Sequence, residues 1–353
     1  MSLTIREKFE KREDGFISSF GVRASCSQGR VRPEESCPVR TVFQQDRDRI
    51  VFSNAFRRLK HKTQVFLSPM GDHYRTRLTH TLEVAEITRT ISRAMRLNED
   101  LAEAIAMGHD LGHTPFGHSG EAALKEIYPP GFTHSDQSLR VVDILERNGK
   151  GLNLTLEVRD GILKHSKGFG DIIPADPGAM SFTVEGRVVR FADVIAYLNH
   201  DLDDAIRSGV VTTDQMPEDC VEILGKNHPR RATTMIRDLI YSSRVVDGEL
   251  NFSFSESVFS AMSNLRRFLI DNVYRSRQVH AEFVKAKKII SEVYVYFLDH
   301  PEELKIRLAS MEMANAFADD VPVERVVCDY IASMTDRYLL NLYNAIFVPK
   351  PLV

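Results

Sequence analysis

Apolar residues recur along most of this chain at the spacing of an α-helix. In residues 78–95 the i, i+4, i+7 spacing places five residues on one helix face: His80, Val84, Ile87, Ile91 and Ala94. Residues at these intervals lie above one another on a helix and form a single buried face. The pattern therefore predicts a helix over residues 78–95 with a histidine on its apolar side.

A shorter helix is predicted in the segment NEDLAEAIAMGHD, residues 98–110. Asn98 precedes it and is a suitable N-cap, because an asparagine side chain can accept a hydrogen bond from the first helical turn. The apolar residues of this segment follow one face. The helix would end at His109 and Asp110, directly before Gly112.

Residues 184–206 predict a long helix with two distinct faces. The apolar face carries Phe191, Ile195, Leu198 and Leu202. A separate face carries polar residues spaced by four, Asp193, Tyr197 and Asp201. Since residues four apart are neighbours on a helix surface, these three side chains are expected to form a polar stripe.

The remaining pattern favours an all-α chain. Residues 1–40 contain glycines and prolines without a sustained period, which predicts an irregular N-terminal arm. Residues 41–210 are helical wherever the pattern is clear, apart from a Gly- and Pro-rich loop at residues 167–180. Residues 211–353 continue with similar helical spacing, so we expect a C-terminal helical region packed on the core.

Composition and charge narrow the class of protein. Of the 353 residues, 43% are hydrophobic and 27% are charged, as in a folded globular chain. The net charge of −3 gives no overall attraction to nucleic acid or to an anionic membrane. The four cysteines form no CxxC pair, and no apolar run has the length of a signal peptide or membrane span. A soluble protein of the reducing cytoplasm is expected.

The segment GHDLGHTPFGH, residues 108–118, concentrates groups that can bind metal. Imidazole and carboxylate side chains together suit divalent transition metals. His109 and Asp110 are adjacent, so both can reach one ion only where the backbone bends, which the expected helix end before Gly112 permits. Two further donors are needed, and His80 and Asp193 are the candidates.

Each of these two residues also has an ordinary interpretation. A histidine on an apolar face is commonly a core residue with a hydrogen-bond partner, and an aspartate on a helix is commonly solvated. The joint pattern of His80, His109, Asp110 and Asp193 favours a metal site over both interpretations.

The order H...HD...D on successive helices resembles the HD-domain metal-dependent phosphohydrolases. Longer segments are similar, in order, to the bacterial dGTPase-like deoxynucleoside triphosphate triphosphohydrolases: RDRIVFSNAFRRLKHKTQVF, HYRTRLTHTLEVAEI, GHDLGHTPFGHSGE, HSDQSLRVV, LEVRDGILKHS and DYIASMTDRY. The similarity extends from about residue 38 to residue 340. It implies an HD-domain helical fold with additional C-terminal helices, in which residues 1–40 are the arm, 41–210 the HD core and 211–353 the C-terminal region.

The resemblance implies roles for the residues of the motif. The implied metal ligands are His80, His109, Asp110 and Asp193. His118 is implied to donate a proton to the departing nucleoside 5′-oxygen or to steady the α-phosphate, with Glu121 orienting it. His113 belongs to the same catalytic group and is implied to hold phosphate, because some members have asparagine there.

Phosphate contacts are implied at two further positions. Arg77 lies three residues before His80 and matches the family's RxxH pattern, and His134 lies in the HSDQS segment. A later arginine grips phosphate in some relatives, and its place here is open between Arg266, Arg267, Arg275 and Arg277.

Sugar contacts are implied by the polar stripe. Tyr197 and Asp201 lie one and two turns beyond Asp193, and a tyrosine ring against the ribose would exclude a 2′-hydroxyl. Gln64 resembles a further sugar contact. In DYIASMTDRY the family's usual glycine is Ser333, so neither Tyr330 nor Asp336 is given a ligand role.

The expected activity is metal-dependent hydrolysis of dGTP, or of dNTPs generally, to a deoxynucleoside and inorganic triphosphate by water attack on the α-phosphorus. Two alternatives stay open. One is another HD phosphohydrolase activity, a nucleotidase or phosphodiesterase. The other is a nucleotide or single-stranded nucleic acid binder with a vestigial site, since residues 38–80 hold nine Arg and Lys against three Asp, a local charge of +6.

The resemblance also implies partners. The donor set suits Mn, Fe, Co, Ni or Zn more than Mg, although phosphate oxygens could bring Mg with the substrate. A homo-oligomer is expected, with a dNTP activator at a subunit interface as in some relatives, and nucleic acid is a secondary partner. Base preference among dNTPs, the native metal and the oligomer size are left open by the sequence.

Overall fold

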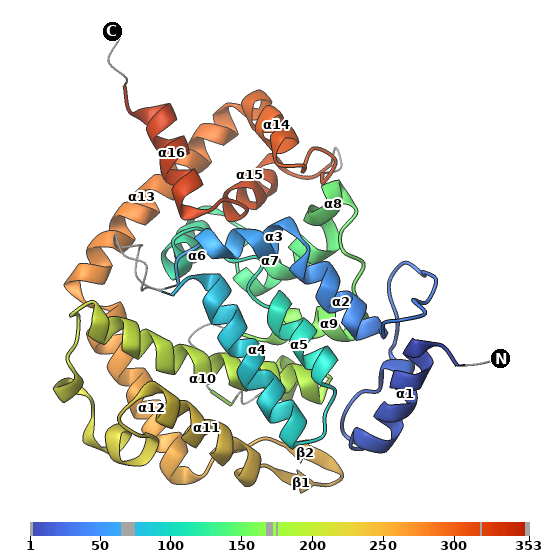
Figure 1. Cartoon of the computed structure of the whole chain (residues 1–353). Coiled ribbons are helices and arrows are strands. Elements are labelled where there is room, and N and C mark those ends of the chain that lie inside the picture. The colour runs from blue at the N-terminus through green and yellow to red at the C-terminus, as the bar shows by residue number, and fades with distance from the viewer. Residues whose placement is uncertain (1–2, 65–74, 167–171, 174–175, 318–319, 350–353) are drawn as a thin grey trace. The chain divides into compact units, whose positions relative to one another are not determined.

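The protein was analysed as a computed structural model, which describes residues 3–64, 75–166, 172–173, 176–317 and 320–349. Its helices are α1 (Ile5–Phe16), α2 (Val42–Val51), α3 (Asn54–Arg58), α4 (Arg77–Ala94), α5 (Glu99–Gly108), α6 (Gly117–Ile127), α7 (His134–Arg140), α8 (Glu146–Gly149), α9 (Leu156–Lys164), α10 (Val184–Arg207), α11 (His228–Ser242), α12 (Glu256–Leu269), α13 (Arg277–Asp299), α14 (Pro301–Ser310), α15 (Val323–Ala332) and α16 (Asp336–Phe347). The expected all-α class is confirmed (Figure 1).

The chain separates into two compact units, each built from three stretches of sequence. The first unit comprises Met1–Arg49, His80–His109 and Leu154–His280. The second unit comprises Ile50–Thr79, Asp110–Asn153 and Ala281–Val353. The boundaries expected at residues 40 and 210 are not the boundaries of these interleaved units. None of the described helices combines the length and hydropathy needed to cross a membrane.

The first unit is organised around α10, a helix of 24 residues that packs against α5, α9, α11 and α12 (Figure 1). Its N-cap, Thr183, accepts a hydrogen bond from Gly186 N at 3.1 Å. Most of the helix is buried, and its apolar face is the one expected from Phe191 to Leu202. Helix α10 is therefore the central helix of the first unit, with neighbouring helices on several sides.

The other two helices expected near the HD motif are also observed. The segment 78–95 forms α4, and α5 begins after Asn98, whose Oδ1 accepts a hydrogen bond from Leu101 N at 3.2 Å. His109 is the C-cap of α5 and is completely buried. The local signals for these helices were therefore sufficient.

The expectation of an irregular N-terminal arm is wrong for residues 5–16, which form α1. The signal was present in the sequence as a capping box. Thr4 accepts a hydrogen bond from Glu7 N at 3.2 Å, and Glu7 accepts one from Thr4 N at 2.7 Å. An ion pair between Arg6 and Glu10, one turn apart, adds to it.

A small hairpin in the C-terminal region was also missed. Strands β1 (Arg244–Val246) and β2 (Glu249–Asn251) pair antiparallel. The connecting residues Asp247 and Gly248 have φ values of 52° and 81°, the left-handed pair that a two-residue hairpin turn requires. The Asp-Gly dipeptide between two apolar stretches was the signal. The loop expected at residues 167–180 lies partly outside the described residues, and Pro177–Ala179 forms a short 3₁₀ turn within it.

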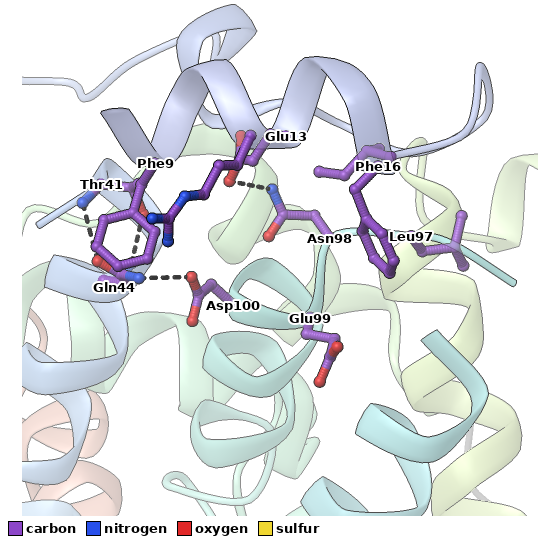
Figure 2. A pocket seen from close by; sticks show the side chains of 11 residues that line it. Phe9, Glu13, Phe16, Thr41, Gln44, Leu97, Asn98, Glu99 and Asp100 are labelled. Atoms are coloured by element: carbon purple, nitrogen blue, oxygen red, sulfur yellow. Dashed lines mark hydrogen bonds between the residues drawn. The ribbon is translucent and has the colours of Figure 1, made fainter. Parts of the chain in front are cut away.

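A cavity of about 390 Å³ lies in the first unit between α1, the start of α2 and the N-terminal end of α5 (Figure 2). Phe9 and Phe16 contribute apolar surface to it. Four of its polar side chains are bonded in pairs: Glu13 Oε1 accepts from Asn98 Nδ2 at 3.2 Å, and Asp100 accepts from Gln44 at 2.8 Å. None of the expected site residues lines this cavity.

Candidate metal and phosphate sites

Three of the expected metal ligands lie together in the first unit. His80 Nε2 lies 3.2 Å from His109 Nε2 and 3.2 Å from Asp193 Oδ1. The three side chains come from α4, from the C-cap of α5 and from the polar stripe of α10. Both histidines are at least 98% buried, so they converge in the interior.

The orientation of His109 is set by the turn that precedes it. Its Nδ1 lies 2.6 Å from the carbonyl oxygen of Ala106. A carbonyl oxygen only accepts, so Nδ1 carries the proton and Nε2 presents a lone pair toward His80 Nε2. His165 repeats this arrangement, with Nδ1 2.7 Å from Ile162 O, and its ring lies edge-on to His109 at a centroid distance of 4.9 Å.

The carboxylate of Asp193 is held in its ionised form. Burial alone would raise its pKa, but the hydrogen bond with His80 and the nearby imidazoles outweigh burial and lower the pKa below its usual range. The site therefore combines one carboxylate with two imidazole nitrogens. Ligands about 2.1 Å from a tetrahedral metal lie about 3.4 Å apart, so the observed separations fit a divalent transition metal.

Asp110, the fourth expected ligand, begins the middle stretch of the second unit. Its Oδ2 accepts a hydrogen bond from Arg77 Nη1 at 2.6 Å, and both side chains are almost fully buried. Arg77 also donates to the backbone oxygen of Gln64 at 3.5 Å. The guanidinium expected to contact phosphate is thus paired with the aspartate of the HD motif.

Three histidines of the second unit surround the carboxylate of Glu121. Glu121 Oε1 accepts hydrogen bonds from His134 N at 2.8 Å and from His134 Nδ1 at 2.9 Å. Glu121 Oε2 lies 3.7 Å from His118 Nδ1 and 4.0 Å from His113 Nε2. The structure therefore brings together His113, His118, Glu121 and His134.

The charges in this cluster follow from its contacts. Burial would raise the pKa of Glu121, but His134 and His118 reverse that effect and lower it. For His134 burial acts downward, yet the charge and hydrogen bond of Glu121 raise its pKa above the usual value. The two residues form an anion and a cation. Their opposite charges neutralise each other. His118, which lies beside them and is about half exposed, is the accessible imidazole of the cluster.

His113 differs from its neighbours. It is completely buried, its ring stacks on His134 at a centroid distance of 4.8 Å, and neither ring nitrogen has a hydrogen-bond partner among the described residues. Burial, reinforced by the charge of Arg77, lowers its pKa well below the usual value. A neutral buried imidazole of this kind can hold a ligand through a hydrogen bond but is a poor proton donor.

The turn that carries this cluster is fixed from outside it. Phe116 and Gly117 have φ values of 62° and 57°, and a Cβ at Gly117 would lie 2.5 Å from a backbone oxygen of Gln64. Asp336 accepts a hydrogen bond from Phe116 N at 2.9 Å, and the buried Lys62 donates to the backbone oxygen of His113. Sequence reasoning assigned no role to Asp336 or Lys62, although Asp336 lies in a segment that resembles the family.

The residues expected to contact sugar are divided between the units. In the first unit Tyr197 is half-buried, and Asp201 is 3% exposed with Oδ2 accepting a hydrogen bond from Tyr274 Oη at 2.5 Å. In the second unit Gln64 is buried, and its Oε1 has no hydrogen-bond partner in the described part of the chain. The structure thus distinguishes Asp201, whose Oδ2 is hydrogen-bonded, from Gln64, whose Oε1 lacks a partner among the described residues.

The four candidate arginines also differ. Arg267, Arg275 and Arg277 are exposed. Arg266 is partly buried and close enough to Tyr197 for its charge to act on the pKa of the phenol, which burial raises. Arg190 of α10 acts on the same phenol. Of the four arginines, Arg266 is the one whose charge acts on a residue of the polar stripe, Tyr197.

Comparison with known families and relatives gives a consistent result. Residues 77–198 match the HD domain, and residues 252–345 match the phosphohydrolase-associated domain. A deoxyguanosinetriphosphate triphosphohydrolase-like protein of Desulfatibacillum aliphaticivorans is 62% identical over 99% of this chain and 100% of that protein. Proteins with the same description are 50% identical in Caldanaerobacter subterraneus subsp. tengcongensis (99% and 97% covered) and 44% identical in Clostridium perfringens strain 13 (99% and 99% covered).

A solved structure, that of a hypothetical protein from Aquifex aeolicus, is 21% identical with a TM-score of 0.46 and covers 86% of this chain and 68% of its own.

Proposed function

Because this chain belongs to the deoxyguanosinetriphosphate triphosphohydrolase-like family of HD-domain proteins, we propose that it hydrolyses deoxynucleoside triphosphates to a deoxynucleoside and inorganic triphosphate. The observation that carries this proposal is the convergence on His80 Nε2 of His109 Nε2 and Asp193 Oδ1, each 3.2 Å from it. The reaction consumes one water, whose oxygen bonds to the α-phosphorus while the bond from phosphorus to the 5′-oxygen breaks.

His80, His109 and Asp193 would hold the metal, and the sequence resemblance adds Asp110, which follows His109 in the chain. When bound, a divalent ion supplies Lewis-acid stabilisation of the negative charge that develops at the α-phosphate. Two imidazoles with carboxylates favour Mn, Fe, Co, Ni or Zn, and Mg could enter with the substrate phosphates.

We propose that His118 donates the proton that the departing 5′-oxygen needs. It is the accessible imidazole of the second unit's cluster, and Glu121 lies 3.7 Å away to orient it. The pairing of Glu121 with His134 keeps a carboxylate beside His118 while supplying a cationic imidazole for phosphate. His113, with both ring nitrogens lacking partners among the described residues, would hold a phosphate oxygen.

Substrate selection is proposed to depend on Tyr197, Gln64 and Arg266. A phenol ring against the sugar would exclude a 2′-hydroxyl, and the buried Gln64 Oε1 offers an acceptor for a sugar hydroxyl. Arg266 supplies positive charge beside Tyr197 for the phosphate chain, and Arg77 is proposed as a further phosphate contact. A cytoplasmic homo-oligomer with a second dNTP as activator is proposed from the sequence resemblance.

The deciding experiment incubates metal-loaded protein with each dNTP, alone and in pairs, and identifies the phosphate product. Inorganic triphosphate without pyrophosphate or orthophosphate supports the proposal, and faster turnover in a pair supports an activator. Stepwise release of phosphate would instead favour a nucleotidase. Ribonucleotides are tested beside the dNTPs as control substrates. The Tyr197→Ala variant is expected to turn over ribonucleotides faster, relative to dNTPs, than the unchanged protein does.

A further inference from the structure

Behind the proposed metal ligands, the first unit contains a histidine that the mechanism does not use. His200 lies on α10, seven residues and about two turns after Asp193, and it is completely buried. Its Nε2 lies 2.8 Å from Nδ1 of His80, and the two rings are nearly perpendicular, with centroids 4.9 Å apart. Helix α10 thus supplies one expected ligand and also contacts a second ligand from behind.

The geometry leaves one consistent assignment of protons for a metal-binding His80. If Nε2 of His80 is to offer a lone pair beside Asp193, its proton must be on Nδ1. That proton then points at His200 Nε2, which must accept it. Consequently the proton of a neutral His200 is on its own Nδ1.

The surroundings of His200 Nδ1 suit that proton. Oδ1 of Asp201 lies 2.7 Å from it, within ion-pair distance although outside hydrogen-bond geometry. The other carboxylate oxygen accepts the hydroxyl hydrogen of Tyr274 at 2.5 Å. Tyr274 ends the segment Ile270–Tyr274 that follows α12, so a second element fixes the carboxylate. Burial and the charge of Asp201 raise the pKa of Tyr274 well above its usual value, so the phenol stays a donor.

We propose that His200 is a positioning residue that accepts the Nδ1 proton of His80 and thereby aims His80 Nε2 at the metal, with Asp201 and Tyr274 holding His200 in its acceptor tautomer. This inference rests on the metal site of the proposed function. It also gives Asp201 a contact with His200, in addition to the sugar contact that the resemblance implies. The second partner of a ligating histidine commonly sets its tautomer and basicity.

The test measures metal binding by the full-length metal-free protein, without nucleotide. Co²⁺ is titrated and followed by its visible absorption, and Zn²⁺ affinity is measured by competition. His200→Leu, which cannot accept a proton, is expected to weaken binding about 10- to 100-fold and to alter the Co²⁺ spectrum. His200→Gln, whose amide oxygen can accept near the position of Nε2, is expected to restore most of the affinity and the spectrum.

Controls separate positioning from folding. His228→Leu removes another histidine of the first unit that lies beside an aspartate, Asp203 at 3.6 Å, and is expected to bind metal like the unchanged protein. Far-UV circular dichroism checks the helical content of each variant. Tyr274→Phe, which removes only the hydroxyl on Asp201, is expected to weaken binding by a smaller factor than His200→Leu.

The outcomes distinguish this inference from the function on which it rests. Unchanged affinity and spectrum in a folded His200→Leu variant would overturn it, as would equal losses in the Leu and Gln variants. His80→Ala with undiminished metal binding would overturn the metal site as well. The metal titrations contain no nucleotide and do not depend on turnover. Failure to form triphosphate in the separate dNTP assay would therefore count against the proposed function alone.

Discussion

Asp193 illustrates how single residues acquire chemistry from their neighbours. Its stripe position on α10 is readable from sequence, but an exposed aspartate at that position would be an ordinary solvated group. Here burial acts to raise its pKa, and the hydrogen bond with His80 and the imidazoles of His109 and His165 act more strongly to lower it. The result is a buried carboxylate anion surrounded by imidazoles, an arrangement that a cation stabilises.

Asp193→Asn is expected to abolish tight metal binding while the helices remain, because an amide keeps the shape but not the charge of the ligand. Metal content after dialysis, measured by atomic emission, checks this, with circular dichroism for the fold. Asp203→Asn, on the same helix but outside the ligand group, is the matched control. Metal retained at one equivalent in Asp193→Asn would remove this residue from the site.

His118→Ala is expected to retain metal and to lose turnover by about 10²- to 10⁴-fold, the usual contribution of a positioned proton donor. The loss should appear in kcat, because proton donation to the leaving oxygen matters in the transition state. Steady-state kinetics with each dNTP provide the measurement. His300→Ala, an exposed histidine elsewhere in the second unit, serves as control. Equal kcat in the two variants would exclude His118 from proton transfer.

At the scale of elements, α10 joins the N-terminal arm to the metal site. Near its first turn the buried Glu185 accepts hydrogen bonds through Oε1 from Val22 N and from Asn98 N, both at 2.9 Å. It therefore fixes the arm and the N-cap of α5 to the helix that carries Asp193. The other oxygen, Oε2, has no hydrogen-bond partner in the described chain. Burial raises the pKa of Glu185 to about 7, and that of the nearby Glu13 to about 7 as well.

This raised pKa predicts a direction for stability against pH. The folded chain keeps the proton of Glu185 up to about pH 7, whereas an unfolded glutamate loses it near 4.5. The stability that Glu185 contributes is therefore full below pH 4.5 and is lost as pH rises through about 7. Glu185→Gln should leave the free energy of unfolding unchanged at pH 4.5 and raise it by about 1–3 kcal/mol at pH 8.

Denaturant titrations at the two pH values measure this difference, and Glu218→Gln, an exposed position, is the control. If Glu185→Gln raised the free energy of unfolding equally at both pH values, the ionisation of Glu185 would not be the cause of the increase.

At the scale of the whole molecule, the chain crosses between its two units five times, and one crossing is the peptide bond between His109 and Asp110. The expected ligands of the first unit come from α4, α5 and α10, elements far apart in sequence. A bound ion would connect three elements at one point. Metal binding is thus expected to be linked to the stability of the folded chain.

Removal of metal by a chelator is expected to lower the melting temperature and abolish turnover, both restored by adding metal back. A ligand that binds only the folded state at 100 times its Kd adds about 2.7 kcal/mol of stability. Differential scanning calorimetry with and without chelator measures the shift. The same shift in Asp193→Asn would mean that the chelator acts elsewhere.

Local sequence determined the helices, the N-cap at Asn98, the polar stripe of α10 and the family, because helix periodicity and capping depend on residues within a few positions. Two further elements, α1 and the hairpin, also follow from local signals: the capping box of Thr4 with Glu7 and the turn dipeptide of Asp247 with Gly248. The proton positions on His80 and His109, the ionisation of Asp193 and the contact of His200 were decided by the tertiary structure alone. Each depends on burial and on partners up to 120 residues away, which no local pattern encodes.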